Sequence, residues 1–304
     1  MYNKKISDSF VGDPSNVVQT FPKFDIKLLC CRCWWLKNWE YTQLSFPFWR
    51  LYHNFQEGAF IRWHGKVIPL SPDHIYLIPP YTDYSTYIGD HKIPLGGCNL
   101  TGGCTMTEGS EGIDKLVEEG AVVHLFIHFV IDNIEGNCTQ GIYEFPLTDK
   151  SRELTARISE ALMNDNTTIQ AVTYLEINAL IYGYLCKFPH QLWNMDTYDS
   201  RISKVTNYIS KHLDESLTNE VLASVVYLTP NSLARLFKDE VGVTLQSYIR
   251  KQRIDYACSL FLHTDLSIDE VASKIGFSNR YHFSRVFHKV THNTPAKYRN
   301  NYSM

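Results

Sequence analysis

Two short segments in the last third of the chain hold the residues best suited to chemistry. The tetrads RLFK at 235–238 and RVFH at 285–288 lie fifty positions apart, and each has basic ends and an apolar centre. At helical spacing the apolar pair faces a core while the basic residues face outward. An outward arginine can pair with O6 and N7 of guanine, and a lysine can contact a phosphate. The spacing therefore predicts two helices that offer the same chemistry to a nucleic acid.

The outward faces of these two helices hold the predicted DNA-binding residues. On the first helix they are Asn231, Ser232, Ala234, Arg235 and Lys238, and on the second they are Asn279, Arg280, Tyr281, His282, Ser284, Arg285 and Lys289. Lys238 and Lys289, with Lys297 and Arg299, are assigned to phosphates, which give affinity without sequence information. A single exposed basic residue can merely solvate a helix, so it is the matched sets that favour binding.

Helix start and stop signals place both segments in a series of short helices. The predicted helices cover 201–213, 218–226, 229–242, 244–262, 267–277 and 278–290. Thr229 followed by Pro230 is a start signal, because threonine caps free N–H groups and proline has none to satisfy. Ser267 with Glu270 forms a capping box, and we expect Ser278 to cap the last helix. Two short helices joined by a brief turn form a helix-turn-helix, and the chain contains two such pairs.

The pattern IDEVA..IGF....F.RVF......TPAKYR, with the helices before it, resembles the DNA-binding domain of the AraC/XylS family over residues 201–300. The resemblance implies two recognition helices, each entering an adjacent major-groove segment on one face of DNA. Since successive turns lie about 34 Å apart, a monomer should cover roughly 17–20 base pairs. Two positions depart from the family pattern. Tyr227 replaces a frequent glycine, and at His292-Asn293 we expect Asn293 to take the left-handed backbone that glycine would adopt.

Charge is divided unevenly along the chain. The net charge is −3, but residues 201–304 hold 14 Lys and Arg against 9 Asp and Glu, whereas residues 1–200 hold 15 against 23. Only the second part suits a polyanion. No apolar run reaches the roughly 18 residues of a membrane span and no signal segment is visible, so we expect a cytoplasmic protein with no membrane partner. Eight cysteines without regular spacing are expected to be free thiols.

The region between Tyr41 and Tyr143 has the pattern of strands. Four segments are short, rich in aromatic or β-branched residues and bounded by Gly, Pro or Asp: FPFWRLYHNF, GAFIRWHG, HIYLIPP and AVVHLFIHFVI. They predict a β-sandwich or barrel. The segment 89–120, with GGCNLTGGC, is predicted to be a long loop with a brief helix at 110–119. For residues 1–40 an arm, a strand and a disordered segment all stay open.

Two helices are predicted after Pro146, with a break at 164–166. Leu154, Ile158, Ala161 and Leu162 share one helical face, and Ile169, Val172, Leu175, Ala179 and Tyr182 share another. Both helices can cover the sheet, and the pair can equally be a dimer interface. The two interpretations stay open.

The family resemblance extends in weaker form to the first domain. KVIPLSPDHIYLIPPYTDYST at 66–86 resembles the cupin segment of sugar-responsive members, and the resemblance implies a barrel that binds a small effector. We therefore expect an α+β protein of two domains. A cupin-like β-barrel with a two-helix dimerisation segment covers 1–187, a linker covers 188–200, and an all-α double helix-turn-helix domain covers 201–304.

Aromatic and polar residues of the expected barrel are the candidate ligand-binding residues. They are Trp49, Tyr52, Arg62, Trp63, His64, Tyr76, Tyr81 and Tyr84, with Arg50 as a further polar contact. Aromatic rings can stack on the apolar face of a sugar, although strand aromatics also form ordinary core. His124 and His128 share a strand face, but a His-x-His cluster is missing, and the Cys30–Cys33 pair has no second pair at ligand spacing. We therefore expect neither a metal nor a cofactor.

These features together predict a transcription regulator that is not an enzyme. We expect a homodimeric activator that binds double-stranded DNA, RNA polymerase and a small-molecule effector, for which a carbohydrate is one candidate. A cupin metalloenzyme, an isomerase or oxygenase fused to a DNA-binding domain, is the main alternative. A regulator whose first domain only dimerises is a third.

Overall fold

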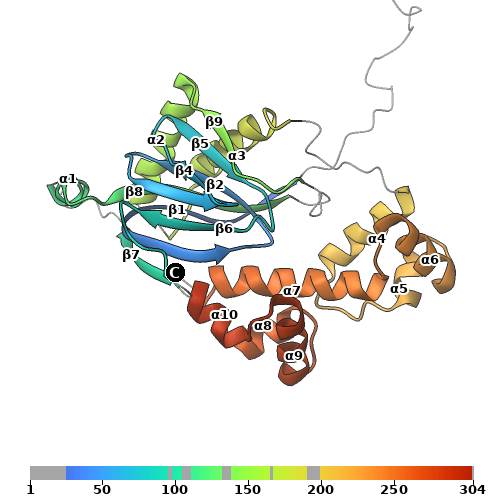
Figure 1. The fold of residues 1–304 in the computed structure, drawn as a ribbon. Coiled ribbons are helices and arrows are strands. Elements are labelled where there is room, and N and C mark those ends of the chain that lie inside the picture. The colour runs from blue at the N-terminus through green and yellow to red at the C-terminus, as the bar shows by residue number, and fades with distance from the viewer. Residues whose placement is uncertain are drawn as a thin grey trace, which may run out of the picture.

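The computed structural model describes residues 25–94, 98–104, 111–131, 138–164, 167–189 and 199–302. They form two parts of different architecture (Figure 1): an antiparallel sheet with helices on one side, and a cluster of helices at the C-terminal end. This layout confirms the predicted two-domain α+β fold class. The predicted linker 188–200 falls mainly on residues 190–198, which lie outside the described ranges, so the domain boundaries stay predictions.

Among the described residues, nine strands form one sheet. They are β1 (Ile26–Leu44), β2 (Trp49–Asn54), β3 (Ala59–Trp63), β4 (Lys66–Pro69), β5 (His74–Ile78), β6 (Tyr84–Ile88), β7 (Cys98–Cys104), β8 (Val122–Ile131) and β9 (Tyr143–Pro146). The strand order is β4-β3-β6-β1-β8-β2-β5-β9, with β7 pairing β1. Each of the four predicted strand segments is confirmed, as β2, β3, β5 and β8.

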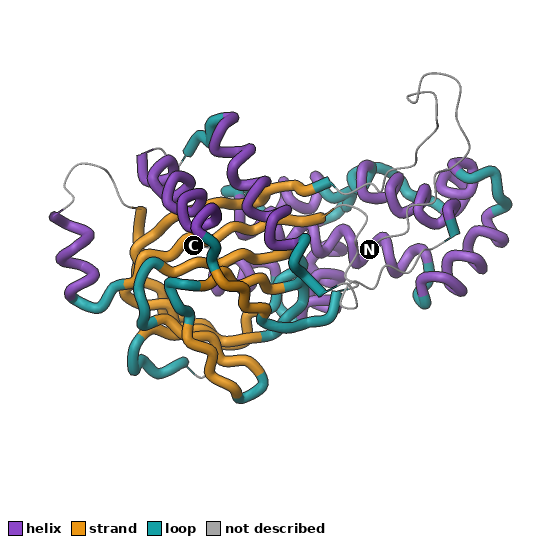
Figure 2. Tube along the Cα trace, turned by 90° about the horizontal axis from the view of Figure 1, so that it is seen from above, coloured by secondary structure: helices purple, strands orange, loops and turns teal. Residues whose placement is uncertain are grey.

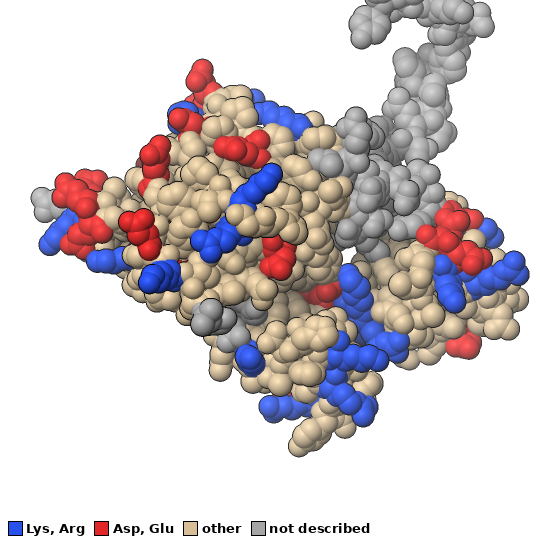
Figure 3. Space-filling model, in the orientation of Figure 1, with Lys and Arg blue, Asp and Glu red and all other residues tan. Residues whose placement is uncertain are grey.

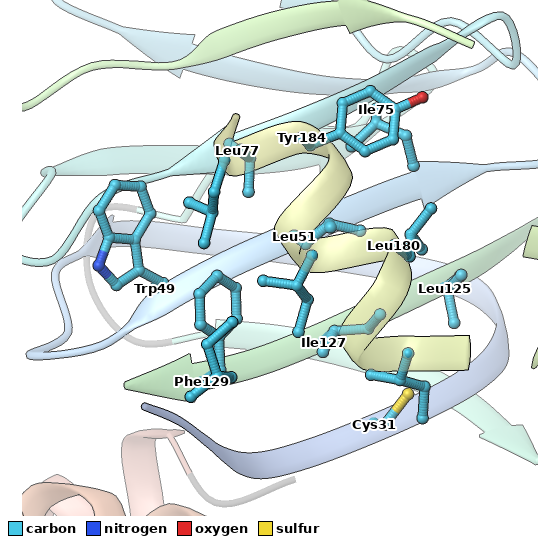
Figure 4. Packing of buried hydrophobic residues seen from close by; sticks show 14 of the residues in the cluster. Cys31, Trp49, Leu51, Ile75, Leu77, Leu125, Ile127, Phe129, Leu180 and Tyr184 are labelled. Carbon is cyan, nitrogen blue, oxygen red and sulfur yellow. The ribbon is translucent and has the colours of Figure 1, made fainter. Parts of the chain in front are cut away.

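Alternation along β8 sorts side chains onto the two faces of the sheet. Leu125 and Phe129 point to the face covered by α2 (Asp149–Asn164) and α3 (Ala171–Leu185). There they pack with Leu180 and Tyr184 of α3, as Figure 4 shows. Phe126 belongs to a separate cluster on the opposite face. The sheet therefore has one core beneath the helices and another on its inner side.

The predicted long loop is wrong in part. Within segment 89–120, Cys98–Cys104 forms β7 and pairs with β1. Gly102, one of the glycines that favoured a loop, is required by this pairing, because a Cβ there would lie 2.5 Å from the carbonyl oxygen of Trp35. Glycine inside a strand often marks such a close backbone approach. The brief helix expected in the same segment is present as α1 (Glu111–Glu118).

The first forty residues, which the sequence left open, contribute a strand to the sheet. β1 begins at Ile26 and pairs along its length with β6, β7 and β8. Residues 1–24 lie outside the described ranges. The strand begins well before the aromatic segments that the pattern identified, because β1 is covered by neighbours on both sides and shows no clean alternation.

The two predicted helices after Pro146 are present, and the predicted face of the second is wrong. In α2, Ile158 and Leu162 are buried as expected. In α3, Val172 is 68% exposed and Leu175 is 66% exposed, whereas a face centred on Ile177 packs on the sheet. α3 is apolar on both sides, so periodicity alone could not tell which side is buried.

The C-terminal part contains the predicted series of helices. They are α4 (Ser200–Lys211), α5 (Asn219–Val225), α6 (Pro230–Val241), α7 (Leu245–His263), α8 (Ile268–Lys274), α9 (Arg280–Thr291) and α10 (Pro295–Tyr302). The predicted cap Thr229 accepts a backbone N–H, Thr218 and Thr244 do the same at the starts of α5 and α7, and Ser267 with Glu270 forms the predicted capping box. Within the described ranges, no helix has the length and apolar character of a membrane span.

Two predicted backbone details are wrong. Asn279, not Ser278, caps α9, and its Oδ1 accepts N–H groups of Tyr281 and His282 at 2.7 and 3.2 Å. The left-handed residue after α9 is His292, with φ of 58°, rather than Asn293. The left-handed residue comes one position earlier than expected, where Thr291 Oγ1 accepts the N–H of Asn293 and donates to its carbonyl.

Replacing Tyr227 by glycine should stabilise the protein. Tyr227 has φ of 55° and is 96% exposed, so the change loses almost no packing. A left-handed backbone costs a non-glycine residue about 1–2 kcal/mol, while glycine loses about 0.5–1 kcal/mol of backbone entropy on folding. We expect Tyr227→Gly to raise the free energy of unfolding by about 0.5–1 kcal/mol in a denaturant titration. Tyr227→Ala keeps the strain and should show no gain; an equal gain for alanine would contradict the account.

Candidate nucleic-acid interface

Two hydrophobic cores in the C-terminal part share the single helix α7. α4, α5 and α6 pack on its first half through Leu245 and Ile249. α8, α9 and α10 pack on its second half through Ile254, Ala257 and Phe261. Figure 1 shows α7 running from one cluster to the other. Because a helix has a fixed rise per residue, α7 sets the distance between the two units.

Arg253, near the middle of α7, ties the two units together. Its Nε donates to the carbonyl of Leu213 at 2.9 Å, its Nη2 to that of Glu215 at 2.6 Å, and its Nη1 to that of Gly276 at 3.2 Å. Gly276 has a left-handed backbone, with φ of 77°. A Cβ there would lie 2.6 Å from the carbonyl oxygen of Leu213. Glycine is therefore required twice, by the turn and by the close approach of the first unit.

α6 and α9 present the same face in both units. Leu233 and Phe237 of α6 are fully buried, and so are Phe283 and Phe287 at the equivalent positions of α9. The burial pattern of residues 231–240 is repeated without change at 281–290. The predicted DNA-binding residues are all exposed or half-buried, and Ala234 and Ser284 are the half-buried ones. Figure 3 shows Lys and Arg side chains gathered over the C-terminal helices.

The exposed basic side chains differ in their partners. Arg235 lies 3.8 Å from Asp239, and Arg280 lies 2.8 Å from Asp269. Both pairs are exposed, so they are weak in water and can be exchanged for contacts to a nucleic acid. Within the described ranges, Arg285 forms no ion pair shorter than 4.0 Å. Unlike the guanidinium groups of Arg235 and Arg280, that of Arg285 is therefore not held by a neighbouring carboxylate.

Three predicted binding residues have structural roles that sequence alone did not reveal. Ser232 Oγ accepts a hydrogen bond from Thr229 Oγ1 at 2.8 Å at the start of α6. Asn279 caps α9, as described above. Arg299 donates to the carbonyl of Leu266, and its guanidinium lies 4.8 Å from the centre of the Phe261 ring. Arg299 thus faces inward, away from the position expected for a phosphate contact.

The predicted ligand-binding residues do not form one site. Tyr52 and Tyr84 meet on the inner side of the sheet, with their hydroxyl oxygens 2.8 Å apart. Tyr76 is buried nearby in the same core but bonds the backbone of the β4–β5 turn. Trp49 points to the opposite face, against Phe129 and Phe188. The remaining candidates on the β3–β4 hairpin are exposed or half-buried: Arg62, Trp63 and His64.

Arg50 is the charged group at the centre of the inner core. It is fully buried, and its Nη1 donates to the hydroxyl of Tyr84 at 2.9 Å while Nη2 donates to the carbonyl of Thr82 at 3.3 Å. Its guanidinium also lies 4.6 Å from the centre of the Tyr84 ring. Burial raises the pKa of both Tyr52 and Tyr84, so both phenols stay protonated. The cluster therefore carries one positive charge.

A stripe of residues along α7 faces the sheet domain, and no sequence pattern predicted this contact. Its residues follow at intervals of four: Lys251, Asp255, Ser259 and His263. Tyr81, which has φ of 60°, donates to Asp255 and lies 2.6 Å from Lys251 Nζ. An i, i+4 ion pair such as Lys251–Asp255 normally indicates a solvated helix face, so it could not predict this contact. The helix that joins the two helix-turn-helix units also joins the two domains.

Comparison with known proteins finds matches to the C-terminal part of the chain. A helix-turn-helix domain family model matches residues 222–301. The regulatory protein PocR of Salmonella typhimurium is 37% identical over 102 residues, which is 34% of this chain and 34% of that protein. The arabinose operon regulatory protein of Escherichia coli is 38% identical over 104 residues, or 33% of this chain and 35% of that protein. The chain thus spans about a third of the length of these relatives.

Among solved structures, the C-terminal domain of AraT, a response regulator from Geobacillus stearothermophilus, is 30% identical. The match covers 35% of this chain and 89% of that one, with a TM-score of 0.35.

Two helix-turn-helix units on one shared helix define a double helix-turn-helix domain. The C-terminal domain of this chain is an AraC-type DNA-binding domain, which confirms the predicted resemblance for this third of the chain. The cupin-like character of the first domain stays a prediction.

Proposed function

We propose that the protein is a sequence-specific DNA-binding transcription regulator with a small-molecule effector. The observation that carries the proposal is the identical burial pattern of α6 and α9 around α7. Two readers of the same geometry, held at a fixed distance, suit successive major-groove segments on one face of double-stranded DNA. Such a protein acts where the chromosome lies, so we propose a cytoplasmic location. As an activator it would also bind RNA polymerase.

Homodimerisation through α3 is the second part of the proposal. The outer face of α3 exposes Val172, Tyr174, Leu175 and Tyr182. A contiguous exposed apolar face on a helix already packed on its other side favours a protein interface. A second copy of this chain would present the same face and bury both.

The effector is proposed to bind on the inner side of the sheet, beside Tyr52, Tyr84 and Arg50. Aromatic rings and a buried guanidinium suit a small molecule with an apolar face and oxygen acceptors, and a carbohydrate is one candidate. Tyr84 starts β6 three residues after Tyr81, which contacts α7. Effector binding would move this turn and change how α7 docks, and thereby which half-sites a dimer can span.

Sequence reading is tested by selecting DNA fragments with the full-length protein at fixed salt. We expect a motif of two blocks about one helical turn apart. Arg285→Ala should weaken binding by about 1–3 kcal/mol and lose the preference in one block only, because a bidentate contact to guanine is removed.

Lys238→Ala is the contrasting variant. It should weaken binding to all sequences alike and reduce the salt dependence by about one phosphate contact. If wild type selects no motif, or if Arg285→Ala selects the same two blocks as wild type, the assignment of sequence reading to α6 and α9 is wrong.

Dimerisation is tested by placing a charge on the outer face of α3. Leu175→Glu should convert a dimer to a monomer in analytical ultracentrifugation, because a carboxylate would be buried against a second apolar helix. Glu153→Gln, on the exposed side of α2, serves as the matched control and should leave the dimer intact. A monomeric wild-type protein at high concentration would overturn this part of the proposal.

A further inference from the structure

Three side chains that can ligate a metal meet where the end of α7 reaches the sheet. They are Cys30 of β1, His128 of β8 and His263 of α7. Their donor atoms, the thiol sulfur and one ring nitrogen from each histidine, all lie within 4.8 Å of one another. His128 Nδ1 and His263 Nε2 are 3.1 Å apart. The cluster therefore spans both domains.

Sheet register fixes two of the three residues. Cys30 and His128 lie directly opposite each other on the antiparallel pair β1–β8. Opposite residues of such a pair project to the same face with their Cβ atoms about 4.5–5.5 Å apart. Neither side chain depends on a loop for its position, so this half of the cluster is rigid.

A backbone carbonyl orients the third residue. His263 Nδ1 lies 2.8 Å from the carbonyl oxygen of Ser259, one turn earlier in α7. A carbonyl can only accept, so Nδ1 carries the proton and Nε2 directs its lone pair toward His128 and Cys30. Histidines that bind metals are commonly held in this way by a backbone carbonyl on the second nitrogen.

An aromatic ring packs beside both histidines. The Phe48 ring lies 5.0 Å from that of His128 and 5.2 Å from that of His263. A bound cation would replace the thiol proton, which leaves to solvent.

Nearby charges decide which cation fits. The positive charge of Arg32 interacts electrostatically with Cys30 and His263, and that of Arg50 interacts with His128. Beside two guanidinium groups, a thiolate with a monovalent ion adds no net charge, whereas a divalent ion adds one positive charge. Thiolate and imidazole ligands select Cu⁺ and Zn²⁺ among biological metals. The charge balance therefore favours Cu⁺.

We propose that Cys30, His128 and His263 form a binding site for a soft transition-metal ion, with Cu⁺ favoured over Zn²⁺. The ion would join the C-terminal end of α7 to β1 and β8 and so hold the DNA-binding domain against the sheet. Metal binding itself does not depend on the proposed function. Its effect on DNA binding does, so the two are measured separately.

The experiment titrates the full-length, reduced, metal-free protein with Cu⁺ and, separately, with Zn²⁺ against a competing chelator. We expect one Cu⁺ to bind per chain, with a lower dissociation constant than Zn²⁺, because Zn²⁺ adds a positive charge to the site. The X-ray absorption spectrum should show one sulfur and two nitrogen ligands. His263→Gln should weaken binding at least tenfold, while Cys186→Ser, which changes an exposed cysteine elsewhere, should have no effect.

Thermal unfolding of both metal-free variants checks that they are folded, and the wild-type spectrum tests the ligand set without any substitution. Failure of both ions to bind at one per chain, or a spectrum without sulfur, would overturn the proposal. DNA affinity of the wild type with and without the ion is then compared. If the ion binds but leaves DNA affinity unchanged, the metal site is confirmed and its proposed role in holding the DNA-binding domain is wrong.

Discussion

The structure depends on one constraint: the single helix α7 has to pack against three neighbours, which are the two helix-turn-helix units and the sheet domain. One side of its first half completes the core of the first helix-turn-helix unit, and its second half completes the core of the other. A stripe from Lys251 to His263 is left for the sheet domain. A helix that is buried on several sides cannot be amphipathic, and α7 accordingly has no continuous polar face in its second half.

The arrangement of α6 and α9, the two proposed recognition helices, follows from that constraint. Since α7 is one helix, and since Arg253 bonds carbonyl groups from both units, α6 and α9 cannot change their separation without loss of these contacts. The strands and the C-terminal helices lie side by side (Figure 2), and Tyr81 of the sheet domain bonds Asp255 of the same helix α7. Under the proposed function, a change at Tyr81 would act on this rigid unit. A regulator of this kind would respond by moving the whole DNA-binding domain, not by altering one reader alone.

Local features such as helix starts could be predicted from the sequence, whereas contacts between segments far apart in the chain could not. Thr229-Pro230 and the Ser267–Glu270 box identify helix starts because a cap acts within four residues. The buried face of α3 and the strand β7 were predicted wrongly. α3 is apolar on both sides and β7 is rich in glycine, and in each case the structure is decided by contact with a segment far away in the chain. His263 has the same limitation: within its helix it is an ordinary last-turn residue, and only tertiary packing brings it beside Cys30 and His128.

The most direct test of the central claim, a fixed distance between two DNA readers, is to change the spacing in the DNA. The full-length protein is bound to its selected site and to the same site with about five base pairs inserted between the two blocks, which turns one block to the opposite face of the helix. Affinity for the second site should fall to that of DNA with a single block. Equal affinity for the two sites would mean that α6 and α9 do not read DNA as one rigid unit.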